Sequence, residues 1–188
     1  MAESVKKDKP RVLIDLDGVI RDFISGLKTV YFREYPDHEI EKIVSRDLEH
    51  YFPIGKKIND FIFYDYFEDI SLESPPYPGT VETLRKWEAV FDIVIVTSQY
   101  PQWRYSTFVW IGHHRLPTNE IHISFQKQKI AGYALLDDFI ENLEAFAATG
   151  RIAVCLDQPW NQEWQGLRVK SVEEFFQLVQ LKISNKKH

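Results

Sequence analysis

The chain has 188 residues, of which 44% are hydrophobic and 14% aromatic, and it carries a formal net charge of −5. This composition allows a sizeable buried core, most simply in one domain with room for an inserted subdomain. The net negative charge argues against bulk nucleic-acid binding and against an acidic membrane surface as partner. Segment 1–10 is polar and no apolar run reaches membrane-spanning length, so a cytoplasmic location is expected.

The first predicted element is a buried strand over 11–16 that ends in a pair of carboxylates. The apolar run Val12-Leu13-Ile14 is followed by Asp15-Leu16-Asp17-Gly18. In open α/β sheets ligands bind beyond the carboxyl ends of the strands, so Asp15 and Asp17 stand where a metal ion and a phosphate could be held. A surface turn is the plain alternative, because Asp and Gly are common in turns. The position of Gly18, fourth in the loop instead of sixth, excludes an EF-hand.

The next stretch predicts a helical insertion. Apolar residues at helical spacing indicate a helix over 22–35, and further helices are expected over 37–45 and 55–66. The Pro- and Gly-rich segment 75–79 fits neither a helix nor a central strand, so it marks the return to the main sheet. We therefore expect a core formed by residues 1–18 and 79–188, and a small helical cap formed by residues 19–78.

The remaining elements alternate between helix and strand. Helices are expected over 80–88, 101–113, 141–148 and 171–181, and strands over 91–96, 120–125, 133–136 and 151–156. The strand over 133–136 ends in Asp137-Asp138 and so repeats the arrangement of the first strand. This alternation predicts an α/β fold, with a Rossmann-like parallel sheet covered by helices on both faces.

Four short motifs, in this order, resemble those of the haloacid dehalogenase-like phosphohydrolases. They are Asp15-Leu16-Asp17-Gly18-Val19, Thr97-Ser98, Lys127 and Leu135-Leu136-Asp137-Asp138. Within that superfamily the pattern is most similar to the 5'(3')-deoxyribonucleotidases, through Asp22-Phe23, Pro76-Tyr77-Pro78-Gly79 and Asp157-Gln158-Pro159-Trp160-Asn161. It departs from them at Gln99 and Phe139, where several members carry Pro and a basic residue.

The resemblance implies a Mg²⁺-dependent phosphomonoesterase that acts on nucleoside monophosphates through an aspartyl-phosphate. Asp15 would be the nucleophile, and Asp17 would act as general acid and base. The implied metal ligands are Asp15, the backbone carbonyl of Asp17, and Asp138. Asp137 would orient the lysine or a metal-bound water.

The resemblance also implies residues that contact the substrate. Lys127 would neutralise charge on the transferring phosphoryl group; Lys129 is the rival, but the spacing to the acid pair favours Lys127. Thr97 and Ser98 would donate hydrogen bonds to phosphate oxygens. Phe23 follows the catalytic loop closely enough to stack on a nucleobase. Tyr51 and Phe52 are weaker candidates for the opposite wall, since the dense aromatic residues there are more typical of a helical core.

Two other functions compete with a nucleotidase. One is a related phosphatase that acts on a nucleic-acid end or a phosphosugar, and the other is a non-catalytic metal- or phosphate-binding module on the same scaffold. Asp17 argues against the module, because binding alone requires no acid or base there. Trp160 and Asn161 fall on the catalytic edge without an assigned role. The expected partner is a small phosphomonoester, and a homodimer is compatible with the sequence.

Overall fold

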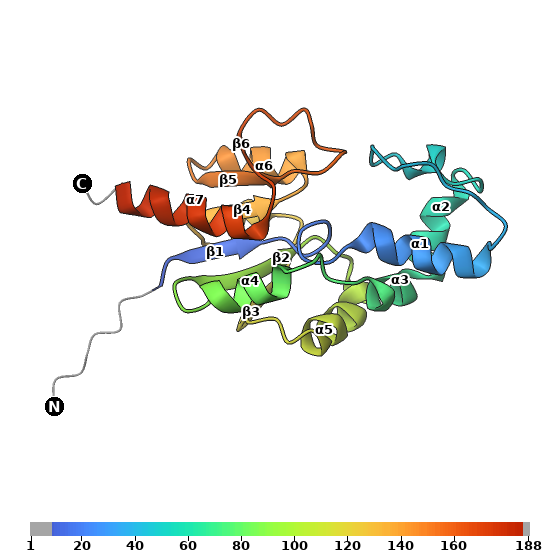
Figure 1. The fold of residues 1–188 in the computed structure, drawn as a ribbon, viewed down its shortest axis with the longest axis horizontal. Coiled ribbons are helices and arrows are strands. Elements are labelled where there is room, and N and C mark those ends of the chain that lie inside the picture. The colour runs from blue at the N-terminus through green and yellow to red at the C-terminus, as the bar shows by residue number, and fades with distance from the viewer. Residues whose placement is uncertain (1–8, 186–188) are drawn as a thin grey trace.

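The computed structural model describes residues 9–185 and contains a six-stranded parallel sheet with the order β3-β2-β1-β4-β5-β6 (Figure 1). This confirms the α/β, Rossmann-like fold that the sequence predicts. Strand β6 was not expected, since three residues with one buried side chain give almost no periodic signal. The strands are β1 (Arg11–Ile14), β2 (Asp92–Thr97), β3 (Glu120–Ile123), β4 (Ala134–Asp137), β5 (Ile152–Leu156) and β6 (Leu167–Val169).

Helices cover both faces of the sheet. On β1, Val12 and Ile14 belong to a hydrophobic cluster shared with α4 (Thr80–Trp87) and α7 (Val172–Asn185). Leu13 points to the other face, into a cluster shared with α6 (Ile140–Ala147). Successive side chains of a strand alternate between faces, so a sheet covered on both sides needs continuous apolar runs. This is why the sequence alone predicts β1, β2, β4 and β5.

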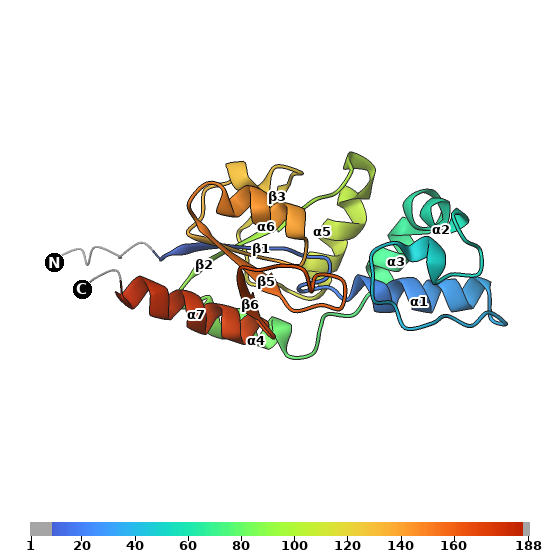
Figure 2. The same ribbon diagram turned by 90° about the horizontal axis from the view of Figure 1, so that it is seen from above.

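Between β1 and α4 the chain forms a helical insertion, which lies beyond the carboxyl end of β1 (Figures 1 and 2). It has a hydrophobic cluster of its own, to which Leu27, Tyr31, Phe52, Phe61 and Ile70 contribute. The insertion therefore packs largely on itself. Its elements are α1 (Phe23–Glu34), the 3-10 turn η1 (Leu48–His50), α2 (Lys57–Asp60), the π-helical turn η2 (Phe61–Asp65) and α3 (Phe67–Glu73).

Parts of the insertion differ from the sequence expectation. The predicted helix over 37–45 is absent: residues 38–44 have no regular secondary structure, with Ile43 buried and Val44 48% exposed, and a helix this short has little stability of its own. The predicted helix over 55–66 is instead divided into α2 and η2, and α3 follows it unexpectedly. Short helices that depend on tertiary packing leave a weak signal in the sequence.

The two segments that join the insertion to the core lie side by side. The N–H of Tyr77 donates to the carbonyl of Ile20 (2.9 Å), and the N–H of Asp22 donates to the carbonyl of Pro75 (2.8 Å). Next to them α3 packs against α5 (Arg104–His113), which follows the 3-10 turn η3 (Pro101–Trp103). Within residues 9–185 no helix is both long and apolar enough to cross a membrane.

Candidate active site

Three neighbouring strands bring the predicted motifs together at one edge of the sheet. Strand β1 lies between β2 and β4, with Ile14 opposite Ile95 on one side and Leu136 on the other. Asp15, which follows Ile14, donates its N–H to the carbonyl of Leu136 (2.9 Å). Parallel strands present their carboxyl ends at the same edge, so the residues after β1, β2 and β4 meet there.

The centre of this edge is a cluster of buried carboxylates. Asp15, Asp137 and Asp138 each offer an oxygen within 4.8 Å of the others, and all three residues are buried. Burial raises the pKa of Asp15 well above its usual value, and the charges of Asp137 and Asp138 add to this effect. The charge of Lys127 acts in the opposite direction on the pKa of Asp15.

Lys127, on the 3-10 turn η4 (Lys127–Lys129), supplies a cation to the cluster. Its Nζ lies 2.7 Å from Asp15 Oδ1 and 2.7 Å from Asp137 Oδ2, and the side chain is 1% exposed. Burial alone would lower the pKa of Lys127, but the charges of Asp137 and Asp15 outweigh burial and raise it. The amine thus stays protonated beside Asp15, whereas Lys129 is exposed.

Asp137 uses its carboxylate to hold neighbouring groups. Besides Lys127, it accepts hydrogen bonds from the N–H of Phe139 (2.8 Å) and from Nδ2 of Asn142 (3.1 Å). Both carboxylate oxygens of Asp137 therefore accept hydrogen bonds from protein donors. Asn142 was not identified from the sequence, because its role depends on the start of α6 lying against the end of β4.

Asp138 has one carboxylate oxygen that can still accept a ligand. Trp160 Nε1 donates to its Oδ2 (2.8 Å), whereas its Oδ1 is buried without a hydrogen-bond partner among the described residues. A Cβ at Gly18 would lie 2.3 Å from Asp138 Oδ2, and Gly18 has a φ of +80°, so only glycine fits in this place. Asn161 supports the same loop by donating to the backbone carbonyl of Asp138 (3.0 Å).

These donors fit a hard divalent cation. Burial raises the pKa of Asp138 to about 6, although the charge of Arg46 and the hydrogen bond from Trp160 act to lower it. Mg²⁺ binds carboxylate oxygens. Asp138 Oδ1, which has no hydrogen-bond partner in the part of the chain that the structure describes, lies beside the buried carboxylate of Asp15. Asp15 and Asp138 are therefore suited to hold such an ion, whereas both oxygens of Asp137 already accept hydrogen bonds from Lys127, Phe139 and Asn142.

Asp17 lies apart from the carboxylate cluster, with its side chain held by two donors. Arg21 binds it through Nε to Oδ1 (2.6 Å) and Nη2 to Oδ2 (3.0 Å), and Gln99 Nε2 donates to Oδ2 (3.0 Å). Gln99 is itself fixed by the hydroxyl of Thr107, which donates to its Oε1 (2.5 Å). Arg21 is fully buried under Trp110, and sequence reasoning missed it although it follows Asp17 by four residues.

A cavity of about 660 Å³ lies between this edge and the insertion. Asp17, Gly18, Ser98 and Asp138 line it on the side of the core. The rest of its wall is rich in aromatic rings, with Phe67 and Trp103 stacked at 4.0 Å between centroids. The aromatic lining residues are Phe23, Phe63, Phe67, Tyr77, Tyr100, Trp103, Phe125, Phe139 and Trp160.

Two of the six residues predicted to contact the substrate, Phe23 and Ser98, line this cavity. Phe23 lines it and packs against Phe67 at 6.0 Å, and Ser98 lines it while donating to the carbonyl of Ser124 (3.2 Å). Thr97 is buried at the end of β2. Tyr51 and Phe52, the weaker candidates for the opposite wall, do not line the cavity: Phe52 is 3% exposed inside the hydrophobic cluster of the insertion, and Tyr51 packs against that cluster, as is typical of a helical core.

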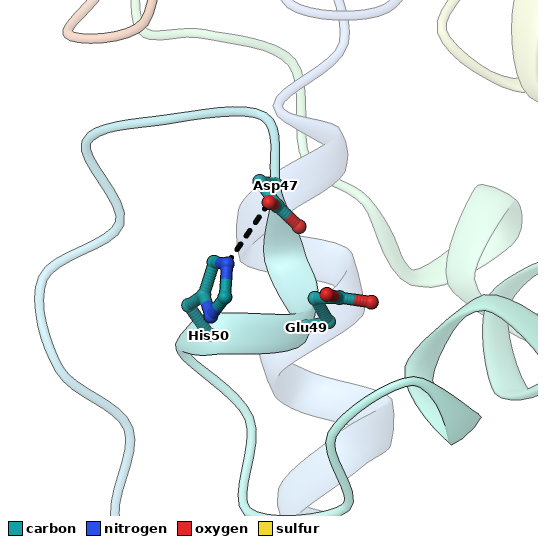
Figure 3. A group of neighbouring side chains, drawn as sticks. All are labelled: Asp47, Glu49 and His50. Carbon is teal, nitrogen blue, oxygen red and sulfur yellow. Dashed lines mark ion pairs between the residues drawn. The ribbon is translucent and has the colours of Figure 1, made fainter.

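A second group of possible metal ligands lies on the surface of the insertion. Asp47, Glu49 and His50 cluster at η1, where His50 Nε2 lies 3.0 Å from Asp47 Oδ2 (Figure 3). Asp47 and His50 are exposed, and all three residues fall within one short turn. This group is a local surface ion pair and gives no sign of a binding site.

The model of the family described as "5' nucleotidase, deoxy (Pyrimidine), cytosolic type C protein" matches residues 9–187. The chain belongs to this family. The match confirms the resemblance to the deoxyribonucleotidases, and it makes the chain a phosphoric monoester hydrolase of the nucleotidase type.

Individual relatives agree with this family. This nucleotidase is 27% identical over 150 residues to the human cytosolic 5'(3')-deoxyribonucleotidase, a match that covers 73% of this chain and 72% of the human protein. It is 26% identical over 140 residues to the mouse mitochondrial 5'(3')-deoxyribonucleotidase, covering 68% of this chain and 64% of the mouse protein.

Solved structures share the fold of this nucleotidase. A haloacid dehalogenase-like hydrolase from Streptococcus pneumoniae superimposes with a TM-score of 0.63 at 12% identity, covering 92% of this chain and 98% of that one. A hydrolase of the same superfamily from Bacillus subtilis, solved with bound magnesium, gives a TM-score of 0.63 at 15% identity and covers 93% and 100%. At such identities the likeness concerns the fold alone.

Proposed function

We propose that this nucleotidase hydrolyses deoxyribonucleoside monophosphates to nucleoside and phosphate, with Mg²⁺ as cofactor and a phosphate ester of Asp15 as intermediate. The observation that carries the proposal is the buried cluster of Asp15, Lys127 and Asp138 beside an aromatic cavity of about 660 Å³. The names of the human and mouse relatives support the same substrate class.

In the first step an oxygen of Asp15 attacks phosphorus, and the bond from phosphorus to the ester oxygen breaks. Asp17 gives a proton to the departing oxygen, so the nucleoside leaves as a neutral alcohol. The contact of Lys127 with Asp15 (2.7 Å) supports a role in compensating the negative charge of the phosphoryl group. Thr97, buried at the end of β2, adds a hydroxyl donor, and Ser98 can donate to phosphate in place of the carbonyl of Ser124.

In the second step water attacks the phosphoryl group on Asp15. Asp17 now takes the proton from this water, the bond between Asp15 and phosphorus breaks, and inorganic phosphate is released. Asp17 is kept in reach of the cavity by Arg21 and Gln99, and its carboxylate lines that cavity. These two donors fix the direction of the carboxylate that handles both protons.

Asp15, Asp138 and the backbone carbonyl of Asp17 are the proposed ligands of Mg²⁺. When bound, the ion would lower the repulsion between the anionic substrate and the carboxylates. Asp138 Oδ1, which has no hydrogen-bond partner within residues 9–185, supports this assignment, and the bonds of Asp137 to Lys127 and Asn142 support a role in positioning the lysine instead.

The insertion, residues 19–78, is the proposed cap that selects the substrate above the core of residues 1–18 and 79–188. Catalytic groups of the core recognise phosphate only, so selection among phosphomonoesters falls to the cavity wall. The aromatic rings of Phe23, Phe67 and Trp103 suit a flat nucleobase. A cytoplasmic location and a homodimer remain predictions.

A screen of phosphomonoesters for phosphate release tests the proposal. The set should include the four deoxyribonucleoside 5'-monophosphates, their 3' isomers, ribonucleotides, phosphosugars, a 5'-phosphorylated oligonucleotide and para-nitrophenyl phosphate, each with Mg²⁺ and with EDTA. We expect release from deoxyribonucleoside monophosphates with Mg²⁺ and none with EDTA. Preference for a phosphosugar or for the oligonucleotide would replace the proposed substrate.

A further inference from the structure

Arg46 is a cation that the insertion brings to the cavity. It lies in the bend just before η1. The segment between α1 and η1 turns back toward the core (Figures 1 and 2). Its guanidinium carbon is 3.0 Å from the ring centroid of Phe139, the residue that follows Asp138. The contact therefore joins the insertion to the loop that carries the proposed metal ligand.

Arg46 brings a positive charge to a cavity whose other charged lining residues are acidic. Among the described residues that line it, Arg46 is the only Lys or Arg, whereas Asp17, Asp138 and Glu141 contribute carboxylates. Lys127 and Arg21 do not line the cavity and are already paired with carboxylates. Lys127 forms ion pairs with Asp15 and Asp137, and Arg21 forms an ion pair with Asp17. An anionic ligand that enters the cavity therefore meets Arg46 as its cationic lining residue.

The Arg46 guanidinium stays charged, and its contact with Phe139 fixes its orientation. The residue as a whole is exposed, but its head group is crowded by the core, and this burial lowers the pKa of Arg46 while the charges of Asp138, Asp15 and Asp137 oppose the change. Arginine remains protonated in proteins. Stacking on Phe139 occupies one face of the planar group and leaves its N–H donors at the edge for an oxyanion.

We propose that Arg46 binds the phosphate group of the substrate from the insertion, and that Phe139 is the positioning residue that holds the guanidinium in place. This inference rests on the proposed function for the identity of the substrate. The phosphate contact itself does not require turnover, because a planar guanidinium binds the oxygens of free phosphate in the same way. A bound phosphate group would thus connect the insertion to the core.

Binding of inorganic phosphate, the expected product, tests the contact. Its Kd in the presence of Mg²⁺ is measured by isothermal titration calorimetry for the wild type, Arg46→Gln, Arg46→Lys and the matched control Lys42→Gln. Lys42 is an exposed cation of the same segment that does not line the cavity. We expect Arg46→Gln to raise the Kd by roughly tenfold or more, Arg46→Lys to raise it less, and Lys42→Gln to change it by less than about twofold.

The positioning role of Phe139 is tested by kinetics. Phe139→Leu should raise KM for the nucleotide several-fold with little change in kcat, and Phe139→Tyr, which keeps the aromatic face, should restore KM. Equal changes in both variants would show that Phe139 only fills space. Melting temperatures of all variants establish that they remain folded.

Several results would overturn the assignment of Arg46. The first is that the wild type binds no phosphate, and the second is that Arg46→Gln binds it as tightly as the wild type does. The third is that Arg46→Gln binds Mg²⁺ more tightly with phosphate affinity unchanged. The last result would make Arg46 a counter-ion of the carboxylates. If the wild type hydrolyses no nucleotide but Arg46→Gln still loses phosphate affinity, the proposed function fails and the Arg46 contact stands.

Discussion

The carboxyl edge of the sheet and the cavity wall that faces it are built from opposite kinds of interaction. At the edge, Lys127 bridges Asp15 and Asp137 at 2.7 Å each, and these side chains are buried. At the wall, Phe67 and Trp103 meet by stacking of rings, and Phe23 packs against Phe67 at 6.0 Å. Directional bonds fix atoms for a reaction, whereas ring contacts tolerate small shifts. Substitutions at the edge should therefore abolish activity, and substitutions at the wall should change selectivity.

The largest effect is expected from Asp15→Asn. The amide keeps the shape of the side chain but cannot attack phosphorus, so kcat should fall by about 10³-fold or more. The melting temperature should stay near that of the wild type or rise, because a buried charge is removed. Steady-state kinetics and a thermal melt of the same sample check both points. Substantial activity in the purified variant would exclude Asp15 as the nucleophile.

The two lysines of η4 give the next largest contrast. Lys127→Ala removes the cation beside Asp15 and should lower kcat by about 10²-fold or more, whereas the exposed Lys129→Ala should stay within about twofold of the wild type. Because Lys127→Ala also leaves buried carboxylates unpaired, its melting temperature must be measured beside its activity. The reverse ranking would assign the phosphoryl contact to Lys129.

Mg²⁺ should stabilise the protein in a pH-dependent manner. The pKa of Asp138 is raised to about 6 in the fold, so the stability contributed by its protonated form is present at low pH and is lost as the pH rises through about 6. A bound cation would compensate the charge that then appears. The melting temperature should rise by about 5–10 °C at pH 7.5 with Mg²⁺ at 100 times its Kd, and by less at pH 5.

Asp138→Asn is the control for the metal effect. It removes both the proposed ligand and the titrating group, so the difference between melts with Mg²⁺ and with EDTA should largely disappear. A full Mg²⁺ effect in this variant would place the ion elsewhere.

The smallest effect is expected at the cavity wall. Phe23→Ala should lower kcat/KM for deoxyribonucleoside monophosphates by roughly tenfold, since stacking on a base contributes about 1–3 kcal/mol, while para-nitrophenyl phosphate should be hydrolysed nearly as before. The comparison variant is Phe52→Leu, which alters the hydrophobic cluster of the insertion and should lower stability without changing the preference. Equal losses on both substrates in Phe23→Ala would assign Phe23 to that cluster.

The parts of the molecule that the sequence predicted are those with local signals. Strands β1 and β4 are buried on both faces, so their apolar runs and the carboxylates behind them are visible in the chain itself. Lys127 could be placed before the structure was known because its motif has a fixed order relative to Asp137 and Asp138. The roles of these residues are still to be tested by the variants above.

The parts that escaped prediction depend on contacts between distant segments. Gln99 reaches Asp17 only because β2 lies beside β1, and Arg46 reaches Phe139 only through the bend after α1. Phe52 and Phe23 are equally aromatic, yet Phe52 is buried within the hydrophobic cluster of the insertion, whereas Phe23 packs against that cluster and also lines the cavity. Aromatic density cannot distinguish these positions, because the distinction is made by packing.

The paired hydrogen bonds at the base of the insertion hold its two junctions with the core side by side. Because Ile20 is bonded to Tyr77 and Asp22 to Pro75, the chain leaves the core and re-enters it at almost the same point. A short connecting peptide, or a different cap grafted between these two junctions, would join the same ends without displacing β1 or α4. Designed chimaeras joined at this junction are therefore expected to keep the arrangement of the sheet edge.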